Sequence, residues 1–129
     1  MNQEIEKFIL QASSKALATR GENGINVVPV SSIRVVDGEI WLINYFMDKT
    51  LINILETKEA SLVCWEKMFG YQIKGEATYL TEGDKFQTAC DWIKEILLDR
   101  TVKGLVILKP IDIFDVSPSK NTHEFKYNT

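Results

Sequence analysis

The sequence predicts a mainly antiparallel β domain of the α+β class, in which short strands form a small barrel flanked by helices. Dipeptides typical of tight turns separate short runs rich in valine and isoleucine. Helical periodicity appears only at the start of the chain and in two later segments. So many short strands favour a closed or nearly closed sheet, because closure removes exposed edges. A length of 129 residues fits a single domain over residues 1–129, with a polar tail over residues 117–129.

The first element is expected to be an amphipathic helix over residues 2–15. Ile5, Phe8 and Ile9 recur at helical spacing, while charged and amide side chains fall on the opposite face. Such a helix is expected to pack across one edge of the sheet.

Three antiparallel strands follow the helix. We expect them at Ala16–Arg20, Ile25–Val36 and Glu39–Asn44, where the period changes to that of strands. The dipeptides Asn23-Gly24 and Asp37-Gly38 lie between them and are typical of two-residue hairpin turns. A meander is the simplest topology.

The second half of the chain adds two helices and four strands. Thr81, with Asp84 three residues on, resembles an acidic capping box and predicts a helix start. Pro110 separates two apolar runs and suggests a bulge or a sheet edge. The expected elements are a helix from Lys49 to about Leu55, strands Ser61–Trp65 and Tyr71–Leu80, a helix from Thr81 to Leu98, and strands Val102–Leu108 and Ile111–Val116.

Composition and charge narrow the classes of function. The chain carries 15 basic and 18 acidic residues, so neither nucleic acid nor an anionic membrane is an expected partner. The single histidine, His123, lies in the polar tail, which argues against histidine-based triads and metal sites. Cys64 and Cys90 lack metal-ligand spacing and are expected to be free, buried thiols. The charged N-terminal residues are typical of neither a signal peptide nor a membrane anchor, so we expect a cytoplasmic protein.

Lys49 and Thr50 form the first candidate site. They stand where an apolar strand ends and a helix is expected to begin, and a helix start offers unpaired N–H groups and a partial positive charge. A lysine and a hydroxyl there would complete a phosphate site. The alternative is that Thr50 only caps a surface helix and Lys49 is solvated.

Two strands carry further candidates. Pro29 and Ser31 interrupt the apolar run Val27–Ile33, which would leave backbone groups free for a ligand; an ordinary bulge is the alternative. Gln72 offers a donor and an acceptor suited to an amide-containing ring, or is simply an exposed strand residue.

Six aromatic residues fit core or interface packing better than a cofactor clamp. They are Trp41, Tyr45, Phe46, Trp65, Phe69 and Tyr71.

Together these segments resemble the flavin-mononucleotide-binding split-barrel family, which includes pyridoxamine 5′-phosphate oxidase and small flavin-binding electron-transfer proteins. Three segments carry the resemblance, in the family's order and spacing, from about residue 8 to residue 117. They are Asn26–Gly38, Trp41–Thr50 and Tyr71–Ala77. The resemblance implies a six-stranded antiparallel split β-barrel with flanking helices, usually a homodimer with two flavin sites at the subunit interface.

The resemblance also implies which residues hold FMN. Lys49 and Thr50 would bind the flavin phosphate, with Ser31 contributing from the second strand. The backbone of residues 28–30 would line the isoalloxazine ring, and residues 44–46 match the strand end beside the ribityl chain and phosphate. The ten implied cofactor-binding residues are Val28, Pro29, Val30, Ser31, Asn44, Tyr45, Phe46, Lys49, Thr50 and Gln72, the last reaching the flavin from its own or the partner subunit.

The departures from the family pattern bear on activity. Position 31 is serine where the pyridoxamine oxidases carry a phosphate-gripping arginine, and the chain ends without their longer C-terminal segment with its basic substrate-binding residues. Oxidation of vitamin B6 is therefore not expected. The resemblance implies an FMN-dependent oxidoreductase or electron carrier, with NAD(P)H or a protein as electron donor and no catalytic side chain, because the flavin supplies the redox chemistry. Alternatives are a non-catalytic module on the same barrel, binding haem, a deazaflavin or stored FMN, and a dimeric scaffold without a cofactor.

Overall fold

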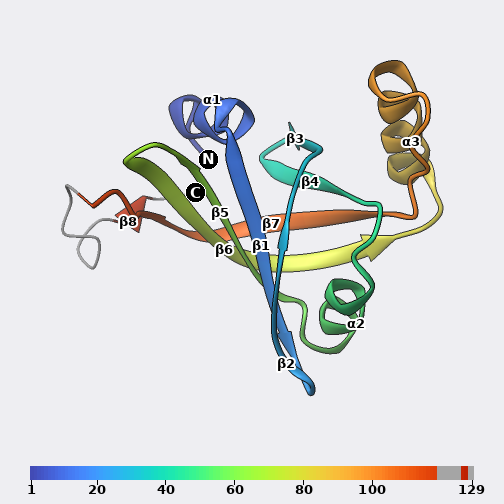
Figure 1. Cartoon of the computed structure of the whole chain (residues 1–129), viewed down its shortest axis with the longest axis horizontal. Helices are drawn as coiled ribbons and strands as arrows, with labels where there is room; N and C mark the ends of the chain where they lie inside the picture. The colour runs from blue at the N-terminus through green and yellow to red at the C-terminus, as the bar shows by residue number, and fades with distance from the viewer. Residues whose placement is uncertain (119–125, 128–129) are drawn as a thin grey trace.

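The computed structural model describes residues 1–118 and 126–127, and it contains three helices around one antiparallel sheet (Figure 1). His123 and most of the expected polar tail lie outside the described residues. The helices are α1 (Gln3–Gln11), α2 (Asp48–Thr57) and α3 (Asp84–Ile96). The strands are β1 (Ser14–Gly21), β2 (Gly24–Pro29), β3 (Ile33–Val36), β4 (Glu39–Asn44), β5 (Glu59–Glu66), β6 (Phe69–Leu80), β7 (Gly104–Asp115) and the short β8 (Lys126–Tyr127).

The strands form a path in the order β2-β1-β5-β6-β7-β4-β3, with β8 paired to β7. The two ends of this path, β2 and β3, are consecutive in the chain and were predicted as the single strand Ile25–Val36. The Val30 N–H still donates to the Lys15 carbonyl at 3.0 Å, whereas the Ser32 carbonyl accepts from the Ile43 N–H at 3.3 Å. The chain therefore leaves β1 and joins β4 within three residues. Counted with β2 and β3 as one broken strand, six long strands make the expected split barrel.

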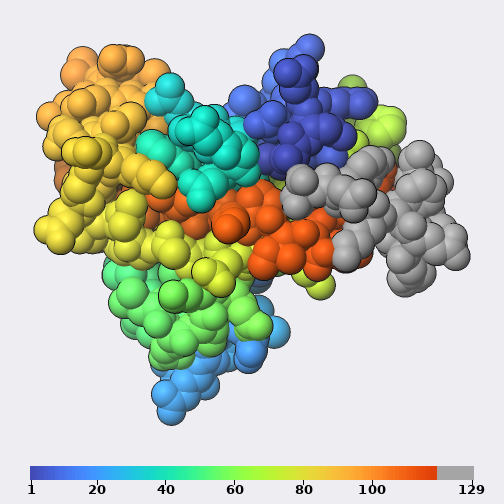
Figure 2. All heavy atoms as spheres, turned by 180° about the vertical axis from the view of Figure 1, so that it is seen from behind, coloured from blue at the N-terminus to red at the C-terminus, as the bar shows by residue number. Residues whose placement is uncertain are grey.

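Both predicted hairpins are confirmed. Asp37 and Gly38 connect β3 to β4 with φ angles of 50° and 79°, as a type I′ turn requires. The turn from β1 to β2 closes at the pair Gly21 and Gly24, and Gly24 has a φ of 102°, a conformation that glycine adopts without strain. The hairpin tip and α2 together project from the body of the molecule (Figure 2).

The prediction of two strands around Pro110 is wrong, because β7 runs unbroken from Gly104 to Asp115. Pro110 is tolerated since the register against β6 shifts beside it, and this bulge was expected. Gly75 pairs with Pro110 there, and a Cβ on Gly75 would lie 2.1 Å from the Lys109 carbonyl oxygen. Only glycine allows the two strands to approach so closely.

The predicted capping box at Thr81 is also wrong. Helix α3 begins at Asp84, its N-cap is Gly83 with a φ of 95°, and no side chain caps it. At the other end of the chain, α1 is shorter than predicted and stops at Gln11. Its start is capped by Asn2, whose Oδ1 accepts a 2.8 Å hydrogen bond from the Ile5 N–H.

Two apolar cores hold these elements together. The larger lies within the curve of the sheet and takes side chains from all parts of the barrel and from α1 and α2, among them Ile5, Ile9, Leu17, Leu42, Ile54, Leu62, Ile73 and Leu108. The smaller packs α3 against β4 and β7 and contains Trp41, Ile43, Tyr45, Ala89, Ile93, Leu105 and Ile107. Tyr45 therefore belongs to a core, which fixes the chain just beyond the end of β4.

Candidate functional site

A slot of about 220 Å³ lies between the end of β2 and the end of β4. Proline stops β2 at residue 29, and the chain leaves β4 after Asn44 to enter α2, so both segments expose irregular backbone at one place. The residues that line the slot are Val28, Pro29, Ser31, Ile43, Tyr45, Phe46, Met47 and Arg100. Five of them were predicted from sequence: Val28, Pro29, Ser31, Tyr45 and Phe46.

Tyr45 is fixed within the slot from two sides. Its hydroxyl lies 2.8 Å from the hydroxyl of Ser32, and this hydrogen bond is buried. The guanidinium of Arg100 lies 5.3 Å from the centre of the Tyr45 ring, within the range of a cation–π interaction. Phe46 is 79% exposed, and the Lys103 ammonium lies 5.2 Å from its ring centre. Two cations therefore stand over the two aromatic rings at the slot.

Val30 and Ser31 differ in what they offer to a ligand. The side chain of Val30 is buried in the larger core, and its backbone N–H donates to the Lys15 carbonyl. Ser31 is exposed, and within the described part of the chain it forms no hydrogen bond through its backbone or its hydroxyl. Ser31 can therefore supply a donor and an acceptor at the slot, while Val30 supports the wall from behind.

Asn44 shapes the turn from β4 into α2. It is 1% exposed, its Nδ2 donates to the Tyr79 hydroxyl at 2.5 Å, and its Oδ1 accepts from the Met47 N–H at 2.6 Å. Because both ends of its amide have partners, Asn44 holds the turn in place and does not face the slot.

Lys49 and Thr50 lie in the first turn of α2, but they point to different surroundings. Lys49 is exposed and lines a second pocket of about 170 Å³, which we call the hairpin pocket. Its lining residues are Asn23, Gly24, Ile25, Asn26, Lys49, Ile52 and Asn53. Thr50 is fully buried, and its Oγ1 accepts a 3.0 Å hydrogen bond from the Asn26 amide. Thr50 therefore does not cap the helix, whose N-cap is Met47.

The slot and the hairpin pocket adjoin along β2. Asn26 lines the hairpin pocket and Val28 lines the slot. Alternate residues of a strand face the same side, so these two side chains point the same way and are about 7 Å apart along the strand. One elongated ligand could occupy both pockets.

Gln72 lies away from both pockets of its own chain. Its Nε2 donates to the Ser61 hydroxyl at 3.1 Å. It occupies one row across the sheet with Pro29, Ala16 and Val63. Three strand spacings separate Gln72 from Pro29 in that row, about 14 Å, which is too far for its side chain to reach the slot.

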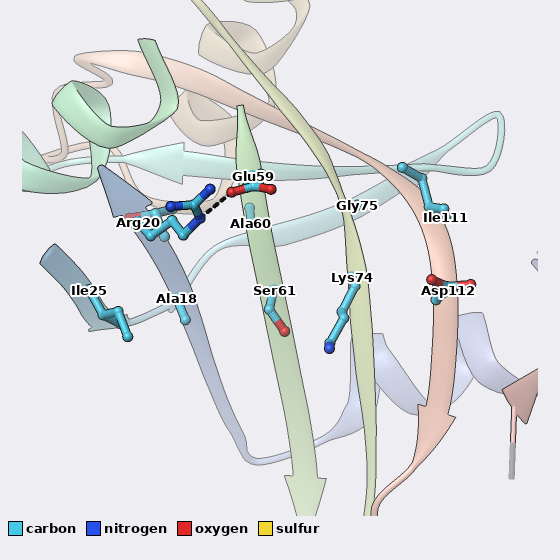
Figure 3. A pocket seen from close by; sticks show the side chains of 11 residues that line it. Ala18, Arg20, Ile25, Glu59, Ala60, Ser61, Lys74, Gly75, Ile111 and Asp112 are labelled. Atoms are coloured by element: carbon cyan, nitrogen blue, oxygen red, sulfur yellow. Dashed lines mark hydrogen bonds and ion pairs between the residues drawn. The ribbon is translucent and has the colours of Figure 1, made fainter. Parts of the chain in front are cut away.

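A third cavity, of about 550 Å³, is an open groove on the sheet face opposite the larger core (Figure 3). Ile25 and Ile111 lie on its two sides with Ala18 between them, and Arg20 and Glu59 form an ion pair at one end. We call it the sheet groove. None of the ten sequence-predicted residues lines it.

Sequence reasoning missed three residues of the slot and one beside Thr50. Ile43 and Met47 flank predicted residues, so extending the predicted segment by one position at each end would have found them. Neither Arg100 nor Asn26 was singled out as a candidate site residue. No local pattern marks either, because Arg100 contacts a residue 55 positions away and Asn26 one 24 positions away.

The cysteines lie outside the slot. Burial raises the pKa of the Cys64 thiol from 9.0 to about 12, and partial burial also raises the pKa of Cys90. Among the described residues, no group of three histidine, cysteine, aspartate or glutamate side chains is placed to hold a metal ion. No helix in the described ranges is long and apolar enough to cross a membrane.

Comparisons of sequence agree with this architecture. A family model described as pyridoxamine 5′-phosphate oxidase matches residues 1–123. A protein of Methanocaldococcus jannaschii, described as uncharacterized, is 34% identical over 105 residues, which cover 78% of this chain and 70% of that protein. The family match spans β1 to β7 and every residue of the slot.

Solved structures share the fold. HupZ from Group A Streptococcus superposes with a TM-score of 0.81 at 23% identity, over 92% of this chain and 95% of that chain. A protein from Syntrophomonas wolfei described as FMN-binding superposes with a TM-score of 0.74 at 21% identity, over 91% and 89% of the two chains. At these identities the likeness establishes the fold alone.

Proposed function

This chain belongs to the pyridoxamine 5′-phosphate oxidase family, and we propose that it is an FMN-binding flavoprotein that acts as an oxidoreductase or electron carrier. The slot is the observation that carries the proposal. Two segments that are distant along the chain, residues 28–31 and 43–47, place five of the ten residues expected at a flavin around one cavity. The FMN-binding protein of Syntrophomonas wolfei, which has the same fold, supports the choice of cofactor.

The slot suits the isoalloxazine ring. Pro29, Ile43 and Met47 give it apolar walls, and the free backbone and hydroxyl groups of Ser31 suit the amide-like edge of the ring. When bound, FMN supplies the redox chemistry itself. The residues of this chain then hold the ring, orient it and keep water from its covered face.

The hairpin pocket suits the phosphate. Lys49 is exposed there, and the first turn of α2 offers backbone N–H groups to an anion. Thr50 acts indirectly in this arrangement, because its buried hydroxyl holds the Asn26 amide in the wall of the pocket. The ribityl chain would follow β2 from one pocket to the other.

We further propose a homodimer in which a second copy packs on the sheet groove. Ile25 and Val27 are 80% and 62% exposed on that face, and Ala16 and Ala18 allow another sheet to approach closely. Gln72 lies in the same row as Ala16. Since it cannot reach its own slot, Gln72 would contact the flavin of the partner subunit.

The visible spectrum of the purified protein tests the function. We expect protein from cells to be yellow, or to become yellow after incubation with FMN and removal of the excess. Bound FMN should be reduced by NADH, NADPH or a reduced protein donor and reoxidised by an acceptor. A colourless protein without measurable FMN affinity would contradict the proposal. Binding without reduction by any donor would favour a storage module, and haem or deazaflavin absorption bands would favour a module for that cofactor.

A further inference from the structure

Arg100 lies in the connection between α3 and β7, and this connection is anchored to the end of β4. The Lys103 N–H donates to the Asn44 carbonyl at 2.9 Å, and the Arg100 N–H donates to the Leu97 carbonyl at 3.1 Å. The backbone therefore holds Arg100 beside the slot, with its guanidinium over the ring of Tyr45.

The Arg100 guanidinium has unused binding capacity. In the described ranges it forms no hydrogen bond and no ion pair, and its stacking on Tyr45 leaves its five N–H donors free. It is also the one charged side chain among the residues that line the slot in the described part of the chain. Any negative charge on a ligand in the slot would therefore meet Arg100.

The position of Arg100 along the site indicates that it meets the ring of FMN and not its phosphate. Lys49 and the start of α2 lie at the hairpin pocket, which suits the phosphate, whereas Arg100 lies at the slot with the apolar walls. Uptake of two electrons and one proton by a flavin at neutral pH leaves one negative charge on the pyrimidine part of its ring. A fixed cation beside that part favours the reduced form.

We propose that Arg100 contacts the flavin ring in the slot and raises its reduction potential by stabilising the negative charge of the reduced ring. This inference rests on the proposed function. Arg100 thereby sets the affinity of the protein for reduced relative to oxidised FMN, a property that no other residue of the slot supplies through charge in the described part of the chain.

The test compares Arg100→Ala with a matched control. Arg34 stacks in the same way, 5.5 Å from the ring centre of Trp92, but it does not line the slot. In Arg100→Ala we expect the preference for reduced over oxidised FMN to fall about tenfold. This lowers the two-electron reduction potential of the bound flavin by about 30 mV. Arg34→Ala should keep the wild-type potential, and Arg100→Lys should keep most of it.

Three outcomes separate the possibilities. If Arg100→Ala binds FMN normally and its bound flavin keeps the wild-type reduction potential, this inference is overturned and the proposed function stays intact. A loss of affinity for FMN but not for riboflavin, which lacks the phosphate, would assign Arg100 to the phosphate and also overturn it. Failure of the wild-type protein to bind any flavin would overturn the proposed function as well. Thermal unfolding of each variant checks that the fold is retained.

Discussion

The hydroxyl groups of Ser32 and Tyr45 lie 2.8 Å apart in a buried hydrogen bond that joins the two segments around the slot. Ser32 belongs to the break between β2 and β3, and Tyr45 follows β4. The same tyrosine ring lies under Arg100 and packs into the smaller core. One side chain thus links the break in the barrel, the wall of the slot and the α3 side of the molecule.

Replacing Tyr45 by Phe removes this hydrogen bond and leaves the Ser32 hydroxyl without its partner. We expect the free energy of unfolding to fall by about 1–2 kcal/mol, since a buried hydroxyl that loses its partner is costly. Urea unfolding of Tyr45→Phe, Ser32→Ala and the double variant measures the coupling. If the two single effects simply add, the hydrogen bond does not hold the segments together.

Lys49→Ala tests where the phosphate binds. We expect the affinity for FMN to fall by about tenfold or more, because a charge-assisted contact to the phosphate is lost. The affinity for riboflavin should not change. Lys94→Ala, at an exposed position on α3, is the control for a general loss of positive charge. Equal losses for FMN and riboflavin in Lys49→Ala would place the phosphate elsewhere.

Val27→Glu tests the proposed subunit interface. Val27 is 62% exposed in the single chain, so the substitution should leave the monomer stable, but in a dimer it would bury a charge on the sheet groove face. We expect sedimentation equilibrium to show dimers for the wild type and monomers for the variant. Leu98→Arg, at a residue 84% exposed beyond α3, should remain dimeric. A dimer that survives Val27→Glu would rule out this face.

The pKa of Cys64 predicts a loss of stability in alkaline solution. Below pH 9 the thiol is protonated in both states, whereas between pH 9 and about 12 it ionises when the chain unfolds but stays protonated in the fold. Stability should therefore fall as the pH rises through this range. Urea unfolding at several pH values should give a shallower fall for Cys64→Ala than for the wild type. Identical slopes would mean that burial does not raise this pKa.

Much of the barrel could be predicted from local chemistry. The Asn-Gly and Asp-Gly turns identify both hairpins, and Pro29 marks the place where the predicted second strand breaks into β2 and β3. Five of the eight residues that line the slot could also be predicted, because they fall in two short segments, residues 28–31 and 45–46. Pro110 misled the strand assignment, since the effect of a proline in a sheet depends on whether the partner strand can bulge, and here Gly75 allows it.

The rest depends on contacts between distant parts of the chain. The sequence placed Thr50 correctly at a helix start. Its buried position could not be predicted, because it depends on a contact with Asn26 of β2. In the sequence, Arg100 looks like a solvated residue. It lies over Tyr45 only because the loop that carries it is anchored to Asn44. Gln72 was placed correctly on a strand, yet its distance from the slot could not be read before the strand order was known.

A crystal structure of the protein grown with FMN tests the central claim most directly. We predict the flavin ring in the slot between Ser31 and Tyr45, with its phosphate beside Lys49 in the hairpin pocket. Flavin bound in the sheet groove instead, or a slot closed by the protein's own side chains at saturating FMN, would contradict the account.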